Sequence, residues 1–245
     1  MFSSTPLLYA PVLAALIAVW GVAYIAGMVL GTPSEDRSRR LARPAKLVMI
    51  GATLAVGGLW LNAATRTEAS RFAYLIMLGL TACAIGDVVL AGFLSIRQPE
   101  IPAMAVFGIG HGLYLAAILT LRAATGAHPD GRLAGALLAG AAAAAAGWAL
   151  LVRYPDGSRA LNAGSLVYGM LLFIATAAGA ELAVRACQMS ILAVGMGLFA
   201  ASDLLLARYL VRKAGFPYVR DVVWILYSAG QVAIAFSIGT AAPVG

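Results

Sequence analysis

The stretch that decides the fold is 72-FAYLIMLGLTACAIGDVVLAGFL-94, an apolar run with a single charged residue, Asp87. At about 1.5 Å per residue, a helix of this length crosses the roughly 30 Å hydrocarbon layer of a membrane. The run has no broad polar face to turn toward water, so it does not fit a surface helix of a soluble domain. The stretch therefore predicts a transmembrane helix that carries one carboxyl group inside the membrane.

Runs of this kind recur along the whole chain, separated by short polar segments rich in proline and glycine that are typical of helix ends. Hydrophobic residues make up 62% of the 245 residues and charged residues 11%, far below the roughly 25% charged content of soluble domains. We expect an all-α polytopic membrane helix bundle, a single transmembrane domain over residues 1–245. Its eight predicted spans are residues 6–30, 44–64, 72–94, 102–121, 133–152, 160–180, 186–207 and 218–240.

The basic residues indicate how the chain crosses the membrane. The net charge is +7, but Lys and Arg are spread over short loops instead of forming one stripe, which argues against a nucleic-acid partner. Twelve of the seventeen lie in or beside the loops that follow spans one, three, five and seven. By the positive-inside rule these odd-numbered loops are cytoplasmic and both termini are not, in the cytoplasmic membrane if the protein is bacterial.

Two of the ten acidic residues, Asp87 and Asp203, lie within the apolar runs. An ionised carboxylate in hydrocarbon costs at least a few kcal/mol, so an acid inside a span suggests a function. Both lie roughly two turns from the cytoplasmic end of a span, at one depth. We interpret the other acids as solvated residues in loops or at helix ends: Glu35, Asp36, Glu68, Glu100, Asp130, Asp156, Glu181 and Asp221.

Polar residues from two further spans converge on the layer of the aspartates. His111 and Tyr114 are three residues apart, and Tyr227 and Gln231 are four apart, so each pair lies on one helix face. These side chains predict a lined cavity, although hydrogen bonds that only hold the bundle together are the alternative. The segments around Asp87 and Asp203 also resemble each other, which suggests two parallel four-span halves that bring the acids together at the centre.

Four segments together resemble the YhhN-type lysoplasmalogenase family over essentially the whole chain. They are Gly86-Asp87-Val88-Val89-Leu90, Phe107-Gly108-Ile109-Gly110-His111-Gly112-Leu113-Tyr114, Phe199-Ala200-Ala201-Ser202-Asp203, and Tyr227 with Gln231. The resemblance implies hydrolysis of the sn-1 vinyl ether of a lysoplasmalogen to a fatty aldehyde and glycerophosphoethanolamine or glycerophosphocholine. The Lys-Pro pair that the family tends to carry before the second span is Arg43-Pro44 here, followed by Lys46.

Vinyl ether cleavage requires an acid and a base. Protonation of the β carbon gives an oxocarbenium ion, which water captures to form a hemiacetal. Two neighbouring carboxyl groups in a medium of low dielectric cannot readily both ionise, so one keeps its proton while its partner stays charged. We therefore predict Asp87 and Asp203 as the catalytic pair. The predicted substrate-binding residues are His111, Tyr114, Tyr227, Gln231, Ser202, Arg43 and Lys46, the last two for the phosphate.

Three alternatives stay open from the sequence. A proton-coupled transporter of a small molecule or lipid would use the same aspartates and should have interrupted helices. A scaffold without chemistry would leave the two acids at one depth unexplained. The hydrolytic mechanism requires no cofactor or metal, whereas Asp87, Asp203 and His111 could ligate a divalent ion. The expected partners are the lysophospholipid substrate and membrane lipids.

Overall fold

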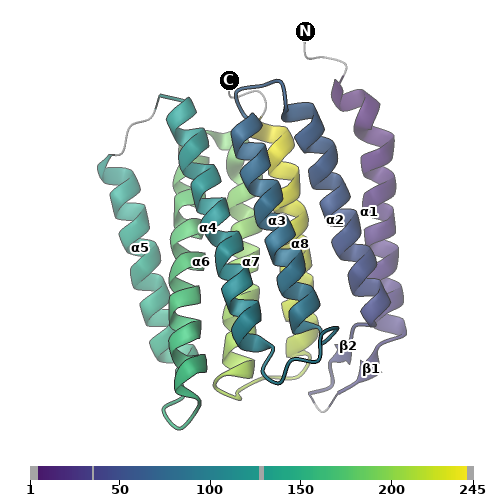
Figure 1. Ribbon diagram of the computed structural model, residues 1–245, viewed down its shortest axis with the longest axis vertical. Helices are drawn as coiled ribbons and strands as arrows, with labels where there is room; N and C mark the ends of the chain where they lie inside the picture. Colours follow the sequence, from purple (N-terminus) through teal and green to yellow (C-terminus); the bar gives the residue numbers. More distant parts are fainter. Residues whose placement is uncertain (1–4, 35, 127–129, 242–245) are drawn as a thin grey trace.

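The protein is a bundle of eight long helices, seen here in a computed structural model that describes residues 5–34, 36–126 and 130–241 (Figure 1). All eight helices of these residues are long and apolar enough to cross a membrane, so the chain is a multi-pass membrane protein of the predicted all-α class. The helices are α1 (Thr5–Val29), α2 (Arg43–Ala64), α3 (Ser70–Leu90), α4 (Glu100–Ala124), α5 (Gly131–Gly147), α6 (Arg159–Arg185), α7 (Ser190–Leu210) and α8 (Val219–Ala241).

The helix boundaries differ from the predicted ones where local interactions outweigh hydropathy. The helix α3 ends at Leu90, four residues early, and Gly92 follows with a φ of +72° that reverses the chain. The helix α6 continues five residues beyond the predicted span, to Arg185. The helix α5 ends in a π-helical turn, Trp148–Val152, and a 3-10 turn, Cys187–Met189, leads into α7.

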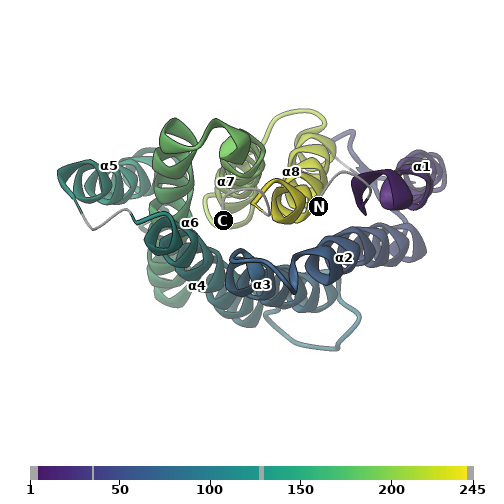
Figure 2. The same cartoon turned by 90° about the horizontal axis from the view of Figure 1, so that it is seen from above.

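The helices form two four-helix halves whose packing repeats. The helix α3 packs along α4 as α7 packs along α8, and α1 packs on α2 as α5 packs on α6. The halves meet through α2 against α8 and through α6 against α4, again in equivalent pairs. Figure 2 shows α1 and α5 at opposite ends of the bundle and the other helices between them. This arrangement agrees with the predicted pair of parallel four-span halves.

Glycine pairs bring α3 against α4 and α7 against α8. A Cβ atom placed on Gly79 would lie 3.1 Å from the Gly110 carbonyl oxygen, and one placed on Gly195 would lie 2.9 Å from the Gly230 carbonyl oxygen. Small residues at such crossings let helix backbones approach closely in a membrane. Gly79 precedes Asp87 by the same spacing as Gly195 precedes Asp203, so the two crossings place the aspartates at equivalent positions.

The four connections that follow α1, α3, α5 and α7 lie at one end of the bundle, which we call the basic end (Figure 1). There, the strands β1 (Thr32–Pro33) and β2 (Arg39–Arg40) pair as a short antiparallel hairpin. The hairpin docks on the start of α8. The Tyr218 amide donates to the Asp36 carbonyl at 2.8 Å, and the Arg39 amide donates to the Asp221 carboxylate at 3.0 Å. Glu35, predicted as a solvated acid, lies outside the described residues.

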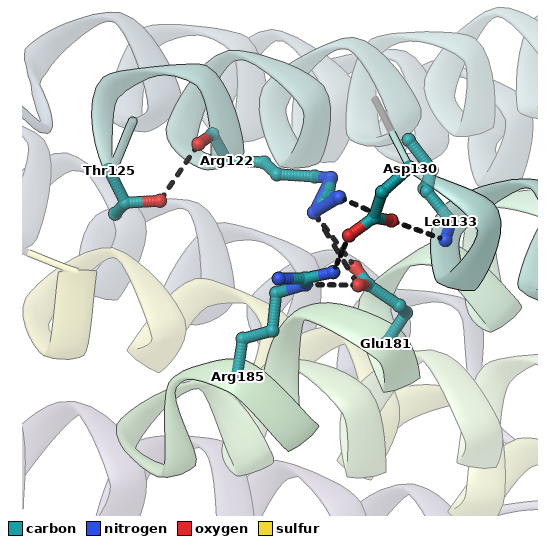
Figure 3. A network of polar contacts seen from close by, with 6 residues as sticks. All are labelled: Arg122, Thr125, Asp130, Leu133, Glu181 and Arg185. Atoms are coloured by element: carbon teal, nitrogen blue, oxygen red, sulfur yellow. Dashed lines mark hydrogen bonds and ion pairs between the residues drawn. The ribbon is translucent and has the colours of Figure 1, made fainter. Parts of the chain in front are cut away.

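An ion-pair network joins α4, α5 and α6 at the opposite end (Figure 3). Arg122 Nη2 lies 2.9 Å from Asp130 Oδ1, and Arg122 Nη1 lies 3.4 Å from Glu181 Oε1. Arg185 pairs with both acids. The interpretation of Glu181 as a solvated acid is wrong, because α6 continues past it and its side chain is only 7% exposed. Buried charges such as these must be paired, because an unpaired one would be strongly destabilising.

The glycine crossings predict which glycines tolerate a methyl group. In Gly195→Ala the new Cβ would meet the Gly230 carbonyl, so we expect a loss of about 1–3 kcal/mol in stability, seen as a lower unfolding temperature in detergent. Gly197 is the matched control on the same helix, because a Cβ there has no atom within 4 Å. Gly197→Ala should match or slightly exceed the wild type. Equal unfolding temperatures for the two variants would contradict the crossing.

The ion-pair network predicts a pH dependence of stability. A hydrogen bond from the Leu133 backbone amide, together with the Arg185 and Arg122 guanidinium groups, lowers the pKa of the Asp130 carboxyl from its ordinary 3.8 to about 2. A lowered pKa means that the carboxylate stabilises the fold above about pH 4, and that this contribution is lost as the pH falls through about 2. Asp130→Asn should therefore lower the unfolding temperature near neutral pH, and the difference should shrink in acid.

The control for this prediction is Asp156→Asn, which removes an exposed acid in the loop between α5 and α6. Its unfolding temperature should follow the wild type at every pH. A difference between Asp130→Asn and wild type that stays constant down to about pH 2 would show that the carboxylate charge does not stabilise the network.

Candidate active site

Asp87 and Asp203 lie in the wall of one cavity of about 680 Å³ among the helix ends and loops of the basic end. Asp87 is buried at 9% exposure and Asp203 is half-buried. The structure thus brings together the two acids that the sequence singled out, and it does so from the third helix of each half.

Asp87 is held by a chain of hydrogen bonds that runs from α8 to α4. The Tyr227 hydroxyl donates to Asp87 Oδ2 at 2.7 Å, and Gln231 Nε2 donates to the Tyr227 oxygen at 3.0 Å. Gln231 Oε1 in turn accepts from the Tyr114 hydroxyl at 3.2 Å. All these groups are buried, where an unpaired polar atom is costly, so each one fixes the next.

Asp203 has a corresponding set of partners on α6, α4 and its own helix. The Tyr168 hydroxyl donates to Asp203 Oδ2, and the Ser202 hydroxyl donates to Oδ1 at 3.2 Å. His111 Nε2 lies 3.1 Å from the Tyr168 oxygen. Because Tyr168 gives its proton to Asp203, His111 is the donor in this contact and carries its proton on Nε2. Each aspartate therefore accepts from a tyrosine of another helix.

Aromatic rings pack against both hydrogen-bond chains. The Phe199 ring centroid lies 4.6 Å from that of His111 and 4.9 Å from that of Tyr227. Phe107 contacts Tyr227 and Tyr168, with ring centroids 6.2 and 6.5 Å apart. The carboxyl groups thus have an apolar surface beside them, which lowers the local dielectric around any charge that forms in the cavity.

Charged residues surround the mouth of the cavity. Four are basic, Arg39, Arg43, Lys46 and Arg220, and two are acidic, Glu100 and Asp221. Aromatic faces hold three of the cations in place. Arg43 lies 5.6 Å from the Phe93 ring, Lys46 Nζ lies 4.7 Å from the Trp224 ring, and Arg220 lies 5.0 Å from the Tyr209 ring. Lys46 also interacts electrostatically with Asp87.

Of the other predicted site residues, three line this cavity and four do not. Tyr227, Arg43 and Lys46 are part of its wall. His111, Tyr114, Ser202 and Gln231 lie behind the aspartates and reach the cavity only through the hydrogen bonds described above. Among the described residues, His, Cys, Asp and Glu form no cluster of three that could hold a metal ion.

A family model matches residues 46–238, the segment that contains both aspartates and both hydrogen-bond chains. The chain belongs to the YhhN family. This is the family of lysoplasmalogenases, as the resemblance of the four segments implied. No curated protein and no solved structure matches the chain.

Three residues of the candidate site in this YhhN-family protein were missed in the sequence. Tyr168 was not predicted because it lies alone in an apolar run, where tyrosine is also common as a membrane-interface residue. Arg39 and Arg220 were counted only as signals of topology. Docking of the β1–β2 hairpin on α8 brings them to the cavity mouth, and their large separation in sequence hides that contact.

The hydrogen bond between Tyr227 and Asp87 predicts an energetic coupling. In Tyr227→Phe the buried Asp87 and Gln231 side chains lose a partner, so we expect a loss of about 1–3 kcal/mol in stability. Asp87→Ala removes the other side of the bond, and the double variant should lose less than the sum of the two. Unfolding of the four proteins in detergent measures the coupling, and strict additivity would contradict the contact.

Proposed function

We propose that this protein is an integral-membrane hydrolase that cleaves the sn-1 vinyl ether bond of lysoplasmalogens. The observation that carries the proposal is the placement of Asp87 and Asp203 in one cavity wall, with basic residues around the mouth above them. Membership of the YhhN family supports it. The products are a fatty aldehyde and a glycerophosphoethanolamine or glycerophosphocholine.

The proposed reaction uses one carboxyl group as an acid and the other as a carboxylate. The protonated aspartate donates its proton to the β carbon of the vinyl ether, and the neighbouring carbon becomes an oxocarbenium ion. The carboxylate stabilises this cation and takes a proton from a water molecule. The oxygen of this water bonds to the cationic carbon at the same time, which gives a hemiacetal. The hemiacetal then collapses: its hydroxyl gives its proton to the first aspartate, its C–O bond to glycerol breaks, and the glycerol oxygen takes the proton held by the second aspartate, so both carboxyl groups return to their starting states.

The hydrogen-bond chains behind the aspartates act as positioning groups in this scheme. Tyr227 and Tyr168 each fix one carboxyl oxygen. The other oxygen of Asp87 is left for substrate or water, and that of Asp203 also accepts from the Ser202 hydroxyl. His111, Tyr114 and Gln231 hold the two tyrosines in turn. Placing the reacting groups in this way removes part of the entropic cost of the reaction.

The mouth suits a zwitterionic headgroup. Arg43, Lys46, Arg39 and Arg220 would bind the phosphate, and Glu100 and Asp221 would face the ethanolamine or choline cation. A lysolipid whose phosphate lies at this level has its sn-1 ether just below, at the depth of the aspartates. By the positive-inside rule we place this end of the bundle at the cytoplasmic face.

The shape of α3 and α7 favours the hydrolase over a transporter. A transporter site of this kind is typically formed by discontinuous helices. Over their described lengths, Ser70–Leu90 and Ser190–Leu210, the two helices that carry the aspartates are unbroken α-helices. The π-helical turn at the end of α5, Trp148–Val152, contributes no residue to the cavity wall.

The test is aldehyde release from a purified lysoplasmalogen, followed by mass spectrometry. Asp87→Asn and Asp203→Asn should each lower the rate by about a hundredfold or more, because each removes one partner of an acid–base pair. Asp156→Asn, which changes an exposed loop acid, should retain wild-type activity. Full activity in both cavity variants would remove the aspartates from the mechanism. Intact lipid that crosses a vesicle membrane would support the transporter.

A further inference from the structure

Two narrow side branches leave the central cavity, one beside each aspartate. The branch beside Asp87 lies among α2, α3 and α8, with Trp20 of α1, and has a volume of about 30 Å³. The branch beside Asp203 lies among α4, α6 and α7 and has a volume of about 50 Å³. Apart from Trp20 of α1 and Leu90 of α3, these two sets of helices are equivalent under the repeat of the two halves, so each aspartate has one branch beside it.

The Asp203 branch is continuous with the cavity. Both are lined by Leu90, Glu100, Phe107, Asp203, Leu206 and Leu210. Beyond this shared part the walls are mostly apolar, with Met104 on α4, Leu161 on α6 and Ala207 on α7. The two hydroxyl groups in those walls already have acceptors, since Ser165 donates to the Asn162 carbonyl and Tyr168 donates to Asp203.

The basic residues at the mouth are distributed unevenly around the cavity. Arg39, Arg43 and Lys46 come from the hairpin and α2, on the side of Asp87, whereas Arg220 of α8 lies over the Tyr209 ring of α7. None of the described residues that line the Asp203 branch is Lys or Arg. We therefore expect a bound ligand with an anionic headgroup and a long apolar chain to lie with its headgroup at the mouth. Along this ligand, Asp87 is nearer the headgroup, Asp203 is nearer the chain, and the chain points into the Asp203 branch.

We propose that the branch beside Asp203 receives the hydrocarbon chain of the lysolipid, and that Ala207 and Met104 limit how the chain enters. The identity of the lipid rests on the proposed function, but the chain site does not require that any bond be cleaved. A chain that enters the branch contacts its walls on several sides, and these van der Waals contacts add to the affinity of the lipid. The branch acts by shape: it fixes the chain and so holds the ether bond between the carboxyl groups.

A pair of matched substitutions tests this assignment. Ala207 and Ala84 are both half-buried alanines, the first lining only the Asp203 branch and the second lining only the Asp87 branch. Ala207→Phe fills the proposed chain site and Ala84→Phe fills the other branch. The probe is a series of saturated 1-O-alkyl lysophosphatidylethanolamines that differ only in chain length. They lack the vinyl bond, so binding is measured without hydrolysis, from the fluorescence of the tryptophans.

We expect Ala207→Phe to weaken binding of the long-chain members by about tenfold and to leave the shortest within about twofold, because a misplaced chain loses its contacts. Ala84→Phe should follow the wild type at every length. The proposal is overturned if Ala84→Phe causes the length-dependent loss, or if neither variant does. If Ala207→Phe does not fold, Met104→Ala widens the same branch and should shift the preference toward longer chains; an unchanged preference would also overturn the proposal.

The failure of this proposal and the failure of the proposed function are distinguishable. If the length dependence holds but the vinyl ether lipids stay intact, the chain site stands and the hydrolase does not. If aldehyde is released but the two variants bind every chain as the wild type does, the hydrolase stands and the chain site does not.

Discussion

A carboxyl group inside a membrane must find hydrogen-bond donors, and this requirement organises the centre of the protein. Asp87 meets it through Tyr227, and Asp203 meets it through Tyr168 and Ser202. Each of these contacts, except that with Ser202, joins two helices, so the aspartates fix α3 to α8 and α7 to α6. The same contacts leave the carboxyl groups facing one cavity, where they can act on a ligand.

The two halves of the bundle are equivalent in packing but not in chemistry. The glycine crossings at Gly79 and Gly195 place the two aspartates alike. The loops break the equivalence, because the hairpin between α1 and α2 docks on α8 and brings its cations to one side of the cavity. A site built from equivalent acids thereby acquires a polar side and an apolar side, as an amphiphilic substrate requires.

Much of the fold could be predicted because the length of an apolar run reports directly on the thickness of the membrane. The eight spans and the all-α class followed from this relation. The helix ends were less predictable: α6 extends to Arg185 because Arg122, Asp130, Glu181 and Arg185 pair with one another, and these partners come from three helices. Hydropathy contains no information about such pairing.

The candidate site was predictable to the extent that its residues are unusual in a membrane. Asp87 and Asp203 stood out for this reason, and His111 and Gln231 did so less strongly. Tyr168 did not stand out, because a tyrosine in an apolar span has several ordinary explanations. The positions of His111 and Tyr114 behind the cavity wall, instead of in it, depend on helix rotation, which the spacing of two residues on one face does not determine.

The central claim is that Asp87 and Asp203 face the sn-1 position of one bound lysolipid. The most direct measurement is an experimental structure of the protein with a saturated 1-O-alkyl lysophosphatidylethanolamine. We expect the ether oxygen beside both carboxyl groups, with the phosphate among Arg43, Lys46 and Arg220 at the mouth. A lipid found only on the outer surface of the bundle, with the cavity occupied by water, would contradict the account.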